Sequence, residues 1–528
     1  MQSPATPQQV IRDAHSALTR EDYQRAHSLA MSVLKHDPTF ADAYFIMALI
    51  SYRHQNIAKA EAIVQRALGF DANNTDYLLL QAQCLLELNQ QEKAKAVVAG
   101  LRDKKLKTAH QNDTLGVLHS RLGQHASALP RFTLTCELEP DSVSYRYNLA
   151  SCLQFSGQFG AAETAYENAI RLAPDHYRSH SSLSQLRKMT EGDNHIERLN
   201  ELWPSLKDDA DARLHVGHAL AKEHEDLADY GLSFEYLQQA KAKKLEKMED
   251  QSASNRRLFA RLHELPAKLE NASQSNCESA EPIFIVGMPR TGTTLVERIL
   301  SSHSWVESAG ELANFSLLVK RQLQTASNWV LDAETIEVSP RLDFTKLGND
   351  YIESTRHLTG GSAHFIDKMP LNFMYVPLIA KALPKAKIIC LRRNPMDTCL
   401  SNYRQLFSTS FSYYNYAYSL KNTADFYVQF HQLMDHYAAT LGSNFFQVHY
   451  ESVVAEPDKQ TRKSLAHCSL PWEAQCLEFH SNTAPVATAS SVQVREKMYT
   501  RAIDRWRHYE PWLGELRTVF EANNIAYE

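Results

Sequence analysis

The chain has 528 residues, of which 44% are hydrophobic and 22% are charged, and these values are ordinary for globular proteins. Its length exceeds what one hydrophobic core usually serves, so it predicts several domains. The net charge of −5 provides no overall basic field, which argues against nucleic acid or an anionic membrane as the main partner.

Cysteine usage and hydropathy bear on the compartment. The eight cysteines are scattered singly, without C-x-x-C pairs, which fits a reducing environment. Residues 1–30 lack a basic start followed by an apolar core, and no apolar run approaches the roughly 20 residues that span a bilayer. These features predict a cytoplasmic protein without a membrane span.

A period of 34 residues runs through the first third of the chain. Small residues recur at this interval in two series. The first is Ala26, Ala60, Ala94, Ala128 and Ala162, and the second is Ala14, Ala48, Ala82, Gly116, Ala150 and Ser184. Prolines fall on a third series, at Pro38, Pro140 and Pro174. Helices that pack closely in a hairpin need small residues where their axes cross, and a proline at the joint stops one helix before the next begins. The alternative is a helical bundle with accidental spacing.

This pattern resembles the tetratricopeptide repeat, whose period is 34 residues. It covers roughly residues 7–187, or about five repeats, and we assign 1–190 to an all-α repeat superhelix. The resemblance implies a concave groove of the kind that binds peptide segments or partner proteins. Residues 191–275 are expected to form a helical connector, and the polar stretch before Pro282 marks the start of a last domain, 276–528.

A strand, a loop and a helix are predicted from residue 283. The apolar run 283–286 is followed by Gly-Met-Pro-Arg-Thr-Gly-Thr-Thr over 287–294 and then by apolar residues at helical spacing. The G-x-x-x-x-G spacing is that of a phosphate-binding loop, where backbone N–H groups face an anion at a helix N-terminus. Thr293 stands where nucleotide triphosphatases carry lysine, which argues against a triphosphate substrate, and Arg290 supplies a cation instead.

This segment resembles the 5′-phosphosulfate loop of sulfotransferases that use 3′-phosphoadenosine 5′-phosphosulfate (PAPS), especially the tyrosylprotein and heparan-type branches. The resemblance implies a cofactor-binding set of Arg290, Thr291, Gly292, Thr293 and Thr294. The plainer alternative is a glycine turn between a strand and a helix.

Sulfonyl transfer requires a base for the acceptor hydroxyl and cations for the leaving group. The resemblance to tyrosylprotein sulfotransferases runs without a gap from Arg290 to Gly310-Glu311, which implies that Glu311 is the general base. His303 is the alternative general base, because cytosolic small-molecule sulfotransferases use histidine. The alternative for Glu311 itself is a helix-capping or salt-bridged surface carboxylate. The tyrosylprotein branch has two adjacent acidic residues where this chain has one, so the chemical identity of the acceptor is left open.

Two further strands carry residues that match the family. Lys368, at the end of strand 364–367, matches the lysine that faces the bridging oxygen and neutralises leaving-group charge, and its alternative is an ordinary strand-end lysine. Strand 386–391 leads through a turn into a helix over 396–407. Arg393 and Ser401 have the family's spacing for 3′-phosphate ligands, with Arg404 assisting, although an arginine at a helix start could also be a solvated surface residue.

The C-terminal part supplies the remaining candidates. Residues 489–495 resemble the family's cofactor-covering loop, which implies that Ser490 aids the leaving group and that Ser491 and Arg505 contact the cofactor. The loop is one residue shorter than in tyrosylprotein enzymes, so the two serines could exchange roles. Tyr450, ending strand 445–450, is a further cofactor contact. The aromatic residues between these sites form either an acceptor wall or lid, or ordinary core, and they are Phe407, Phe411, Tyr413, Tyr414, Tyr416, Tyr418, Phe426, Tyr427 and Phe430.

Together these features predict a multidomain protein, with an α-helical repeat superhelix followed by an α/β P-loop-like domain that has a mainly parallel sheet and binds its ligand beyond the strand carboxyl ends. The predicted reaction is sulfonyl transfer from PAPS to an acceptor hydroxyl, with protein tyrosine favoured over a glycan or small-molecule hydroxyl. A nucleotide kinase and a non-catalytic repeat scaffold are the remaining alternatives. No metal and no nucleic acid are expected, an acceptor protein is expected in the repeat groove, and the oligomeric state is open.

Overall fold

The computed structural model describes residues 6–88, 90–102, 104, 106–327, 330–359, 361–409, 412–482 and 496–528. The chain forms two compact units, Met1–Arg187 and Lys188–Glu528. Within the described ranges, no helix combines the length and the apolar character that crossing a membrane requires.

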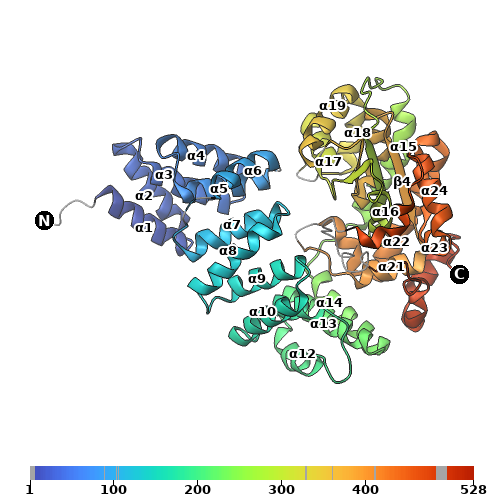
Figure 1. Ribbon diagram of the computed structural model, residues 1–528, viewed down its shortest axis with the longest axis horizontal. Helices are drawn as coiled ribbons and strands as arrows, with labels where there is room; N and C mark the ends of the chain where they lie inside the picture. The colour runs from blue at the N-terminus through green and yellow to red at the C-terminus, as the bar shows by residue number, and fades with distance from the viewer. Residues whose placement is uncertain are drawn as a thin grey trace. The chain divides into compact units, whose positions relative to one another are not determined.

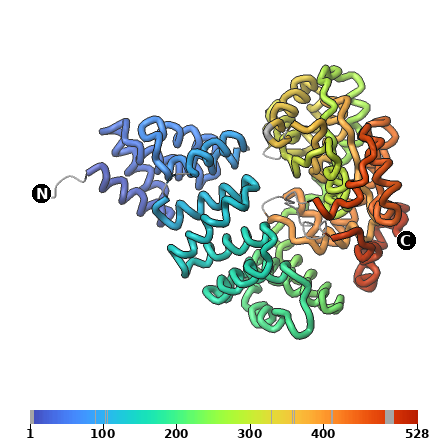
Figure 2. The backbone as a smooth tube through the Cα atoms, in the orientation of Figure 1, coloured from blue at the N-terminus to red at the C-terminus, as the bar shows by residue number. Residues whose placement is uncertain are grey.

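The first unit consists of helices that follow one another as hairpins, from blue to cyan-green in Figure 2. Its helices are α1 (Pro7–Thr19), α2 (Tyr23–His36), α3 (Ala41–Arg53), α4 (Ile57–Phe70), α5 (Thr75–Glu87), α6 (Gln91–Gly100), α7 (Ala109–Arg121), α8 (His125–Leu138), α9 (Val143–Phe155), α10 (Phe159–Leu172) and α11 (Tyr177–Ser184). Every alanine of the two predicted series has an exposed fraction of 0%. Each proline of the third series lies two residues after a helix ends, so the predicted all-α repeat architecture is confirmed.

The turns inside the hairpins share one conformation. Glu21 and Gln55 have left-handed φ angles of 62° and 59°, and the next residue caps the following helix. The carboxylate of Asp22 accepts a hydrogen bond from the backbone N–H of Arg25, and the Asn56 side chain caps α4 in the same way. The repeated turn brings the second helix of each hairpin back along the first.

Neighbouring repeats are also joined by polar side chains one period apart. The Gln111 amide donates to Asp76 at 2.9 Å, and the Asn148 amide donates to Asp113 at 2.9 Å. Both pairs are separated by 35 residues along the chain. The first unit is therefore held together by short-range contacts that recur with the sequence period.

The second unit begins with the helices of the predicted connector. They are α12 (Ile196–Leu202), η1 (Trp203–Leu206), α13 (Ala210–Asp226), α14 (Tyr230–Leu245) and α15 (Ser252–Leu269), where η denotes a 3₁₀-helix. The α13–α14 hairpin repeats the turn of the first unit, because Ala228 has a φ of 62° and Asp229 caps α14. Helix α15 places Phe259 and Leu262 in the same hydrophobic core as Phe284 of the sheet. These helices therefore belong to the second unit.

A five-stranded sheet forms the centre of the second unit (Figure 1). Its strands are β1 (Pro282–Gly287), β2 (Val306–Ser308), β3 (His364–Asp367), β4 (Lys387–Arg392) and β5 (Phe445–His449), in the spatial order β2-β3-β1-β4-β5. Every pairing is parallel, which confirms the predicted parallel sheet. The strand predicted over 386–391 begins and ends one residue later, the strand predicted over 445–450 ends at His449, and β2 was not predicted.

Further helices cover both faces of the sheet. They are α16 (Thr293–Leu300), α17 (Asn314–Leu323), α18 (Ala333–Val338), η2 (Ser339–Arg341), α19 (Phe344–Thr355), η3 (Arg356–Leu358), η4 (Pro370–Tyr375), α20 (Val376–Ala382), α21 (Pro395–Arg404), η5 (Ser412–Tyr418), α22 (Leu420–Thr440), η6 (Gly442–Asn444), α23 (Tyr450–Ala455), α24 (Pro457–His467), η7 (Ala474–Ser481), η9 (Arg505–Trp512) and α25 (Gly514–Ala522). Alternate residues of β1 enter opposite cores: Phe284 and Val286 pack in one, and Ile283 and Ile285 in the other. A parallel strand that is buried on both faces therefore carries apolar residues on both faces.

Candidate active site

The candidate site lies at the carboxyl edge of the parallel sheet. Each strand is followed within three residues by one predicted site residue: β1 by Arg290, β2 by Glu311, β3 by Lys368, β4 by Arg393 and β5 by Tyr450. Because parallel strands end at the same edge, the fold gathers residues that are scattered over 160 positions of the sequence.

The loop after β1 has the backbone of an anion-binding turn. Gly287 has a φ of 150°, and a Cβ there would lie 2.7 Å from the carbonyl oxygen of Leu391 on the neighbouring strand. Arg290 and Gly292 both have left-handed φ angles, of 68° and 97°. Successive backbone N–H groups in such a turn, next to the start of α16 at Thr293, can point toward one anion.

Two side chains from the β4–α21 segment hold this loop. The Nη1 atom of Arg393 donates to the carbonyl oxygen of Arg290 at 2.9 Å, and the Asn402 amide donates to that of Pro289 at 2.8 Å. The Tyr416 hydroxyl in turn donates to the Asn402 side-chain oxygen at 2.9 Å. Asn402 was not predicted as a site residue. Its neighbour Ser401, which was predicted, is half-buried on the same helix.

Arginines gather beside the loop. Burial lowers the pKa of Arg290 to about 10, and the nearby charges of Arg393 and Arg505 add to that effect. Arg393 is only 8% exposed, which excludes the reading as a solvated surface arginine. Its Nε atom is buried and has no hydrogen-bond partner among the described residues. A buried guanidinium with an unused donor is suited to an anionic ligand.

Asp397 organises the C-terminal side of this cluster. Its carboxylate accepts hydrogen bonds from the backbone N–H groups of Asp504 and Trp506, at 2.9 Å and 3.0 Å, and lies 3.6 Å from Nη2 of Arg393. Burial raises the pKa of Asp397, and the charge of Arg393 opposes that shift. The segment that carries Arg505 is thereby fixed beside Arg393. Asp397 was not predicted, since the two backbone N–H groups that it accepts from lie more than 100 positions away.

Tyr450 closes the cluster from the β5 side. The Cζ atom of Arg393 lies 4.8 Å from the centre of the Tyr450 ring, a cation–π distance. The same ring lies against Gly292, where a Cβ would come within 2.6 Å of it. Tyr450 therefore touches both the loop and the arginine that holds it.

Lys368 and Glu311 form an ion pair at the ends of β3 and β2. The backbone N–H of Lys368 donates to the carbonyl oxygen of Gly310 at 2.9 Å, so the chain after β2 continues along β3 and carries Glu311 to the lysine. The Lys368 side chain is 1% exposed, whereas that of Glu311 is 37% exposed. The carboxylate is thus accessible from solvent, and the ammonium group is held below it.

Glu297 of α16 is a buried neighbour of this pair. One of its carboxylate oxygens lies 3.8 Å from the Lys368 Nζ atom, and the other accepts a hydrogen bond from the Ser308 hydroxyl. Burial raises the pKa of Glu297, and the charge of Lys368 partly offsets this. Glu297 was not predicted, because a glutamate inside a helix has no local pattern that distinguishes it from a surface residue.

The aromatic residues that lie between the predicted sites in the sequence divide between the two predicted roles, acceptor wall or ordinary core. Tyr416, Tyr418, Phe426, Tyr427 and Phe430 are buried core residues. Tyr414 stacks on Phe407 with ring centres 4.3 Å apart, and Tyr413 meets Tyr414 edge-on at 4.6 Å. Burial raises the pKa of Tyr413 to about 12, with the charge of Glu311 as the second cause. The aromatic residues near Glu311 are therefore Phe407, Tyr413 and Tyr414, hereafter the aromatic wall. Phe411 lies outside the described residues.

Comparison with known families agrees with this geometry. Residues 282–474 match the sulfotransferase family, and residues 17–84 and 143–176 match tetratricopeptide repeats. The second unit contains a sulfotransferase domain. It is preceded by tetratricopeptide repeats in the first unit.

Similar proteins and solved structures are found at low sequence identity. The chain is 32% identical over 336 residues to an uncharacterized protein of Aquifex aeolicus, covering 62% of this chain and 44% of that protein. It is 23% identical over 239 residues to the protein-tyrosine sulfotransferase of Drosophila melanogaster, covering 42% of this chain and 46% of that enzyme. The chain thus spans less than half the length of these two relatives. Among solved structures, the sulfotransferase domain of the Synechococcus PCC 7002 olefin synthase is 18% identical with a TM-score of 0.36, covering 49% of this chain and all of that domain.

His303 has a structural position in the sulfotransferase domain. It is 2% exposed, its Nε2 atom lies 3.0 Å from the carbonyl oxygen of Pro471, and its Nδ1 atom accepts the backbone N–H of Trp305 at 3.1 Å. Both ring nitrogens are engaged with the backbone. This arrangement favours Glu311 over His303 as a base.

The remaining predicted residues of the sulfotransferase domain fall into two groups. Ser490 and Ser491 lie outside the described residues. Arg404 and Arg505 both form ion pairs with Glu225 of α13, a residue that was not predicted. The helix predicted over 396–407 is observed as α21 and ends at Arg404.

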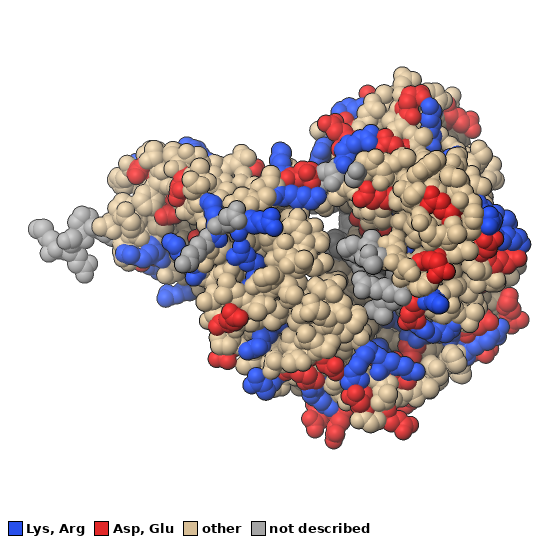
Figure 3. Space-filling model, viewed as in Figure 1, with Lys and Arg blue, Asp and Glu red and all other residues tan. Residues whose placement is uncertain are grey.

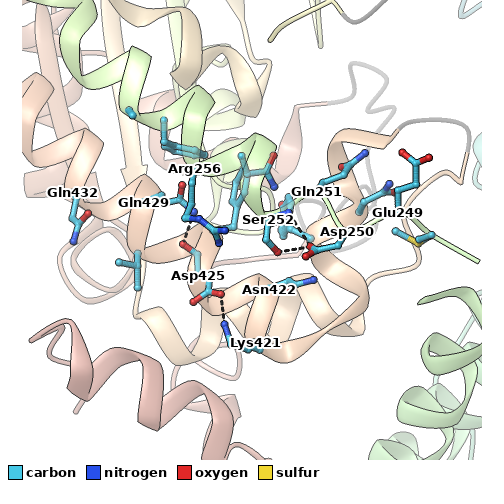
Figure 4. A pocket seen from close by; sticks show the side chains of 18 of the residues that line it. Glu249, Asp250, Gln251, Ser252, Arg256, Lys421, Asn422, Asp425, Gln429 and Gln432 are labelled. Atoms are coloured by element: carbon cyan, nitrogen blue, oxygen red, sulfur yellow. Dashed lines mark hydrogen bonds and ion pairs between the residues drawn. The ribbon is translucent and has the colours of Figure 1, made fainter. Parts of the chain in front are cut away.

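A separate pocket of about 860 Å³ opens elsewhere in the second unit (Figure 4). It lies between the α14–α15 segment and the start of α22, and none of the predicted site residues lines it. Two of its charged side chains pair with each other, because Lys421 donates to Asp425 at 2.6 Å. Tyr416, which forms part of its wall, is the residue that donates to Asn402 behind the anion-binding loop.

On the molecular surface, basic and acidic side chains are interspersed over the face shown in Figure 3. This agrees with the small net charge of −5. The positive charge relevant to an anionic ligand is therefore the local cluster of Arg290, Arg393, Arg404 and Arg505 at the edge of the sheet.

Proposed function

We propose that the sulfotransferase domain transfers the sulfonyl group of PAPS to an acceptor hydroxyl, with Glu311 as the general base. The main support is that the Lys368–Glu311 pair and the arginine cluster follow strands of one sheet edge, on either side of a phosphate-binding loop without lysine. A base, a buried cation and an anion site are the three elements that this reaction requires.

The residues at this edge fit the two anionic ends of PAPS. The loop residues Arg290, Thr291, Gly292, Thr293 and Thr294 would hold the 5′-phosphosulfate. Arg393 and Ser401 would hold the 3′-phosphate, and the unused Nε atom of Arg393 is a donor for it. A doubly charged phosphate favours charge-assisted donors of this kind.

The chain's own groups then have distinct roles. When bound, PAPS supplies the sulfonyl group, and the product that remains is 3′-phosphoadenosine 5′-phosphate (PAP). The Glu311 carboxylate accepts the proton from the acceptor hydroxyl as the acceptor oxygen bonds to sulfur. The Lys368 ammonium group, buried and fixed by the strand end, stabilises negative charge on the oxygen that separates from sulfur.

We further propose a protein tyrosine as the acceptor. The aromatic wall beside Glu311 offers ring faces against which a phenol can pack, and such contacts favour an aromatic acceptor over a sugar. The name of the Drosophila relative points in the same direction. A glycan or small-molecule hydroxyl is the second candidate, because the Glu311 side chain is 37% exposed and therefore accessible to acceptors other than a phenol.

Cofactor binding and the base can be tested in one protein preparation. PAP should raise the melting temperature more than ATP with Mg²⁺ does, because a ligand of the native state stabilises it by mass action. Glu311→Gln should lower turnover with PAPS by about 10²- to 10⁴-fold while PAP affinity is retained. Glu307→Gln, on β2 itself, is the matched control. Equal shifts with PAP and ATP, or normal turnover of Glu311→Gln, would refute the proposal.

For the repeats we propose that they gather a protein acceptor, since tetratricopeptide repeats suggest protein–protein interaction. Tethering raises the effective concentration of an acceptor without any new catalytic contact. A fragment of residues 188–528 should then bind PAP normally but lose activity on a protein acceptor far more than on a tyrosine peptide. Full activity of the fragment on the protein would exclude recruitment, and loss of PAP binding would indicate that the repeats stabilise the sulfotransferase domain instead.

A further inference from the structure

Glu225 lies at the point where two arginines of the candidate cofactor site meet. It is 8% exposed, near the end of α13, and its Oε1 atom accepts a hydrogen bond from Nε of Arg505 at 3.0 Å and another from Nη2. Its Oε2 atom forms an ion pair with Nη2 of Arg404. Arg505 begins η9 and Arg404 ends α21, so one carboxylate from a third helix joins both.

The hairpin that carries Glu225 is fastened to the same elements by a second buried group. Lys241 of α14 is 2% exposed, and its Nζ atom donates to the carbonyl oxygen of Ala417 at 2.8 Å. The ammonium group also lies 4.9 Å and 5.0 Å from the ring centres of Tyr403 and Tyr418. Tyr403 precedes Arg404 on α21, so the position of α13–α14 is coupled directly to the position of that arginine.

The contacts leave part of each guanidinium group available. Arg505 uses its Nε and Nη2 donors on Glu225, and no described residue accepts a hydrogen bond from its Nη1 atom. Arg404 contacts Glu225 through Nη2, and its Cζ atom lies 5.6 Å from the Tyr509 ring. Two arginines placed this closely repel each other, and a carboxylate between them offsets that repulsion and fixes the direction of both planes.

We propose that Glu225 is a positioning residue that orients Arg404 and Arg505 toward the 3′-phosphate of the sulfonyl donor. This inference rests on the proposed use of PAPS. It assigns a part in cofactor recognition to the α13–α14 hairpin, outside the residues 282–474 that match the family. The residue does not touch the reacting atoms and acts only through the two arginines.

The test compares two ligands that differ by the 3′-phosphate, PAP and 5′-AMP, in the full-length chain. The wild type should bind PAP more tightly than 5′-AMP. Glu225→Gln should reduce that preference by about tenfold or more, the loss expected when a charge-assisted hydrogen bond that orients a ligand is removed. Asp211→Asn, which removes an ion-paired carboxylate from the exposed start of the same helix, should leave the preference unchanged.

Each other outcome is decisive. An unchanged preference in Glu225→Gln, or an equal loss for both ligands, would overturn the positioning role, and tighter PAP binding would show that Glu225 competes with the phosphate. Glu225→Asp keeps the charge and should show a smaller loss of preference. It decides the question if Glu225→Gln does not fold, because an unchanged preference in Glu225→Asp would then refute the proposal. A wild type without preference for PAP would remove the proposed function together with this inference.

Discussion

The repeat unit and the sulfotransferase domain bring together residues at very different sequence distances. In the repeats, Gln111 contacts Asp76 and Asn148 contacts Asp113, both 35 positions apart. In the second unit, which contains the sulfotransferase domain, Arg393 reaches Arg290 over 103 positions, and Arg505 reaches Glu225 over 280. The first unit can form from local pairings, whereas the site of the second requires the whole domain to be assembled.

The two units also bury different kinds of side chain. The helix crossings of the repeats bury alanines. The edge of the sheet buries charged groups, among them Lys368, Asp367 and Asp397, each at most 1% exposed. Burying a charge is costly unless it is paired, and at this edge Lys368 pairs with Glu311 and Asp397 with Arg393. The comparison predicts that substitutions in the two units will have different consequences.

The largest expected effect is on catalysis, at the buried ammonium group. Lys368→Met should lower kcat/KM with PAPS by about 10²- to 10³-fold, because it removes the group proposed to stabilise the developing charge. Lys385→Met, which removes an exposed lysine paired with Glu278, is the control and should change little. Steady-state kinetics measure both. A Lys368→Met enzyme with near-normal kcat/KM would contradict the role given to the buried charge.

An intermediate effect is expected at two tightly packed glycines, one in a helical hairpin of each unit. A Cβ at Gly217 of α13 would lie 2.5 Å from the Cβ of Ala240, and one at Gly116 of α7 would lie 2.8 Å from the ring of Phe132. The ring can tilt away, but the alanine moves only with its helix. Gly217→Ala should therefore cost about 1–3 kcal/mol of unfolding free energy, and Gly116→Ala should cost less.

These two variants also distinguish the units by function. Because Gly217 lies on the helix of Glu225, Gly217→Ala should weaken PAP binding, whereas Gly116→Ala should not. Urea denaturation and PAP titration measure the two quantities, with Gly69→Ala as a control, since nothing lies within 4 Å of a Cβ there. Weaker PAP binding in Gly116→Ala would show that the units are not separable in this way.

The last expected effect is a change in the pH dependence of stability. Burial raises the pKa of Asp367 from 3.8 to about 7, although the carboxylate accepts a hydrogen bond from the Tyr351 hydroxyl at 2.8 Å. Between these two pH values the folded protein keeps a proton that the unfolded chain has lost, so this group makes stability fall as the pH rises from about 4 to 7. Asp367→Asn cannot ionise and should reduce that fall.

The measurement is the free energy of unfolding in urea at several pH values across that window. Asp350→Asn, a surface carboxylate paired with Lys346, is the control and should keep the wild-type pH dependence. A wild-type slope retained in Asp367→Asn would assign the pH dependence to other groups.

Several features of the fold could be predicted because they repeat or because they are local. The 34-residue spacing identified the helix crossings, since each crossing in such an array needs a small residue at the same place. The apolar runs of β1 and β4 were recognised because strands buried on both faces carry few polar residues, and β3 and β5 were also predicted as strands. Strand β2, with three residues, is too short for a pattern of this kind.

The partners within the site could not be predicted in the same way. Asn402, Asp397 and Glu297 are ordinary polar residues of helices, and nothing near them in the sequence marks them as buried. Glu225 lies in a stretch that the sequence assigned to a connector, yet it contacts two arginines from the far end of the chain. Their positions depend on which helix packs against which edge of the sheet.

The sequence by itself determined the repeat period, the parallel α/β class, and the strand ends that carry Arg290, Lys368 and Arg393, because local periodicity and short loop motifs encode these features. Only the tertiary structure decided that Lys368 pairs with Glu311, that Asp397 and Tyr450 surround Arg393, and that α13 supplies Glu225. The physical reason is that a buried charge takes its partner from whatever element the packing brings within hydrogen-bond distance, and no local pattern specifies that element.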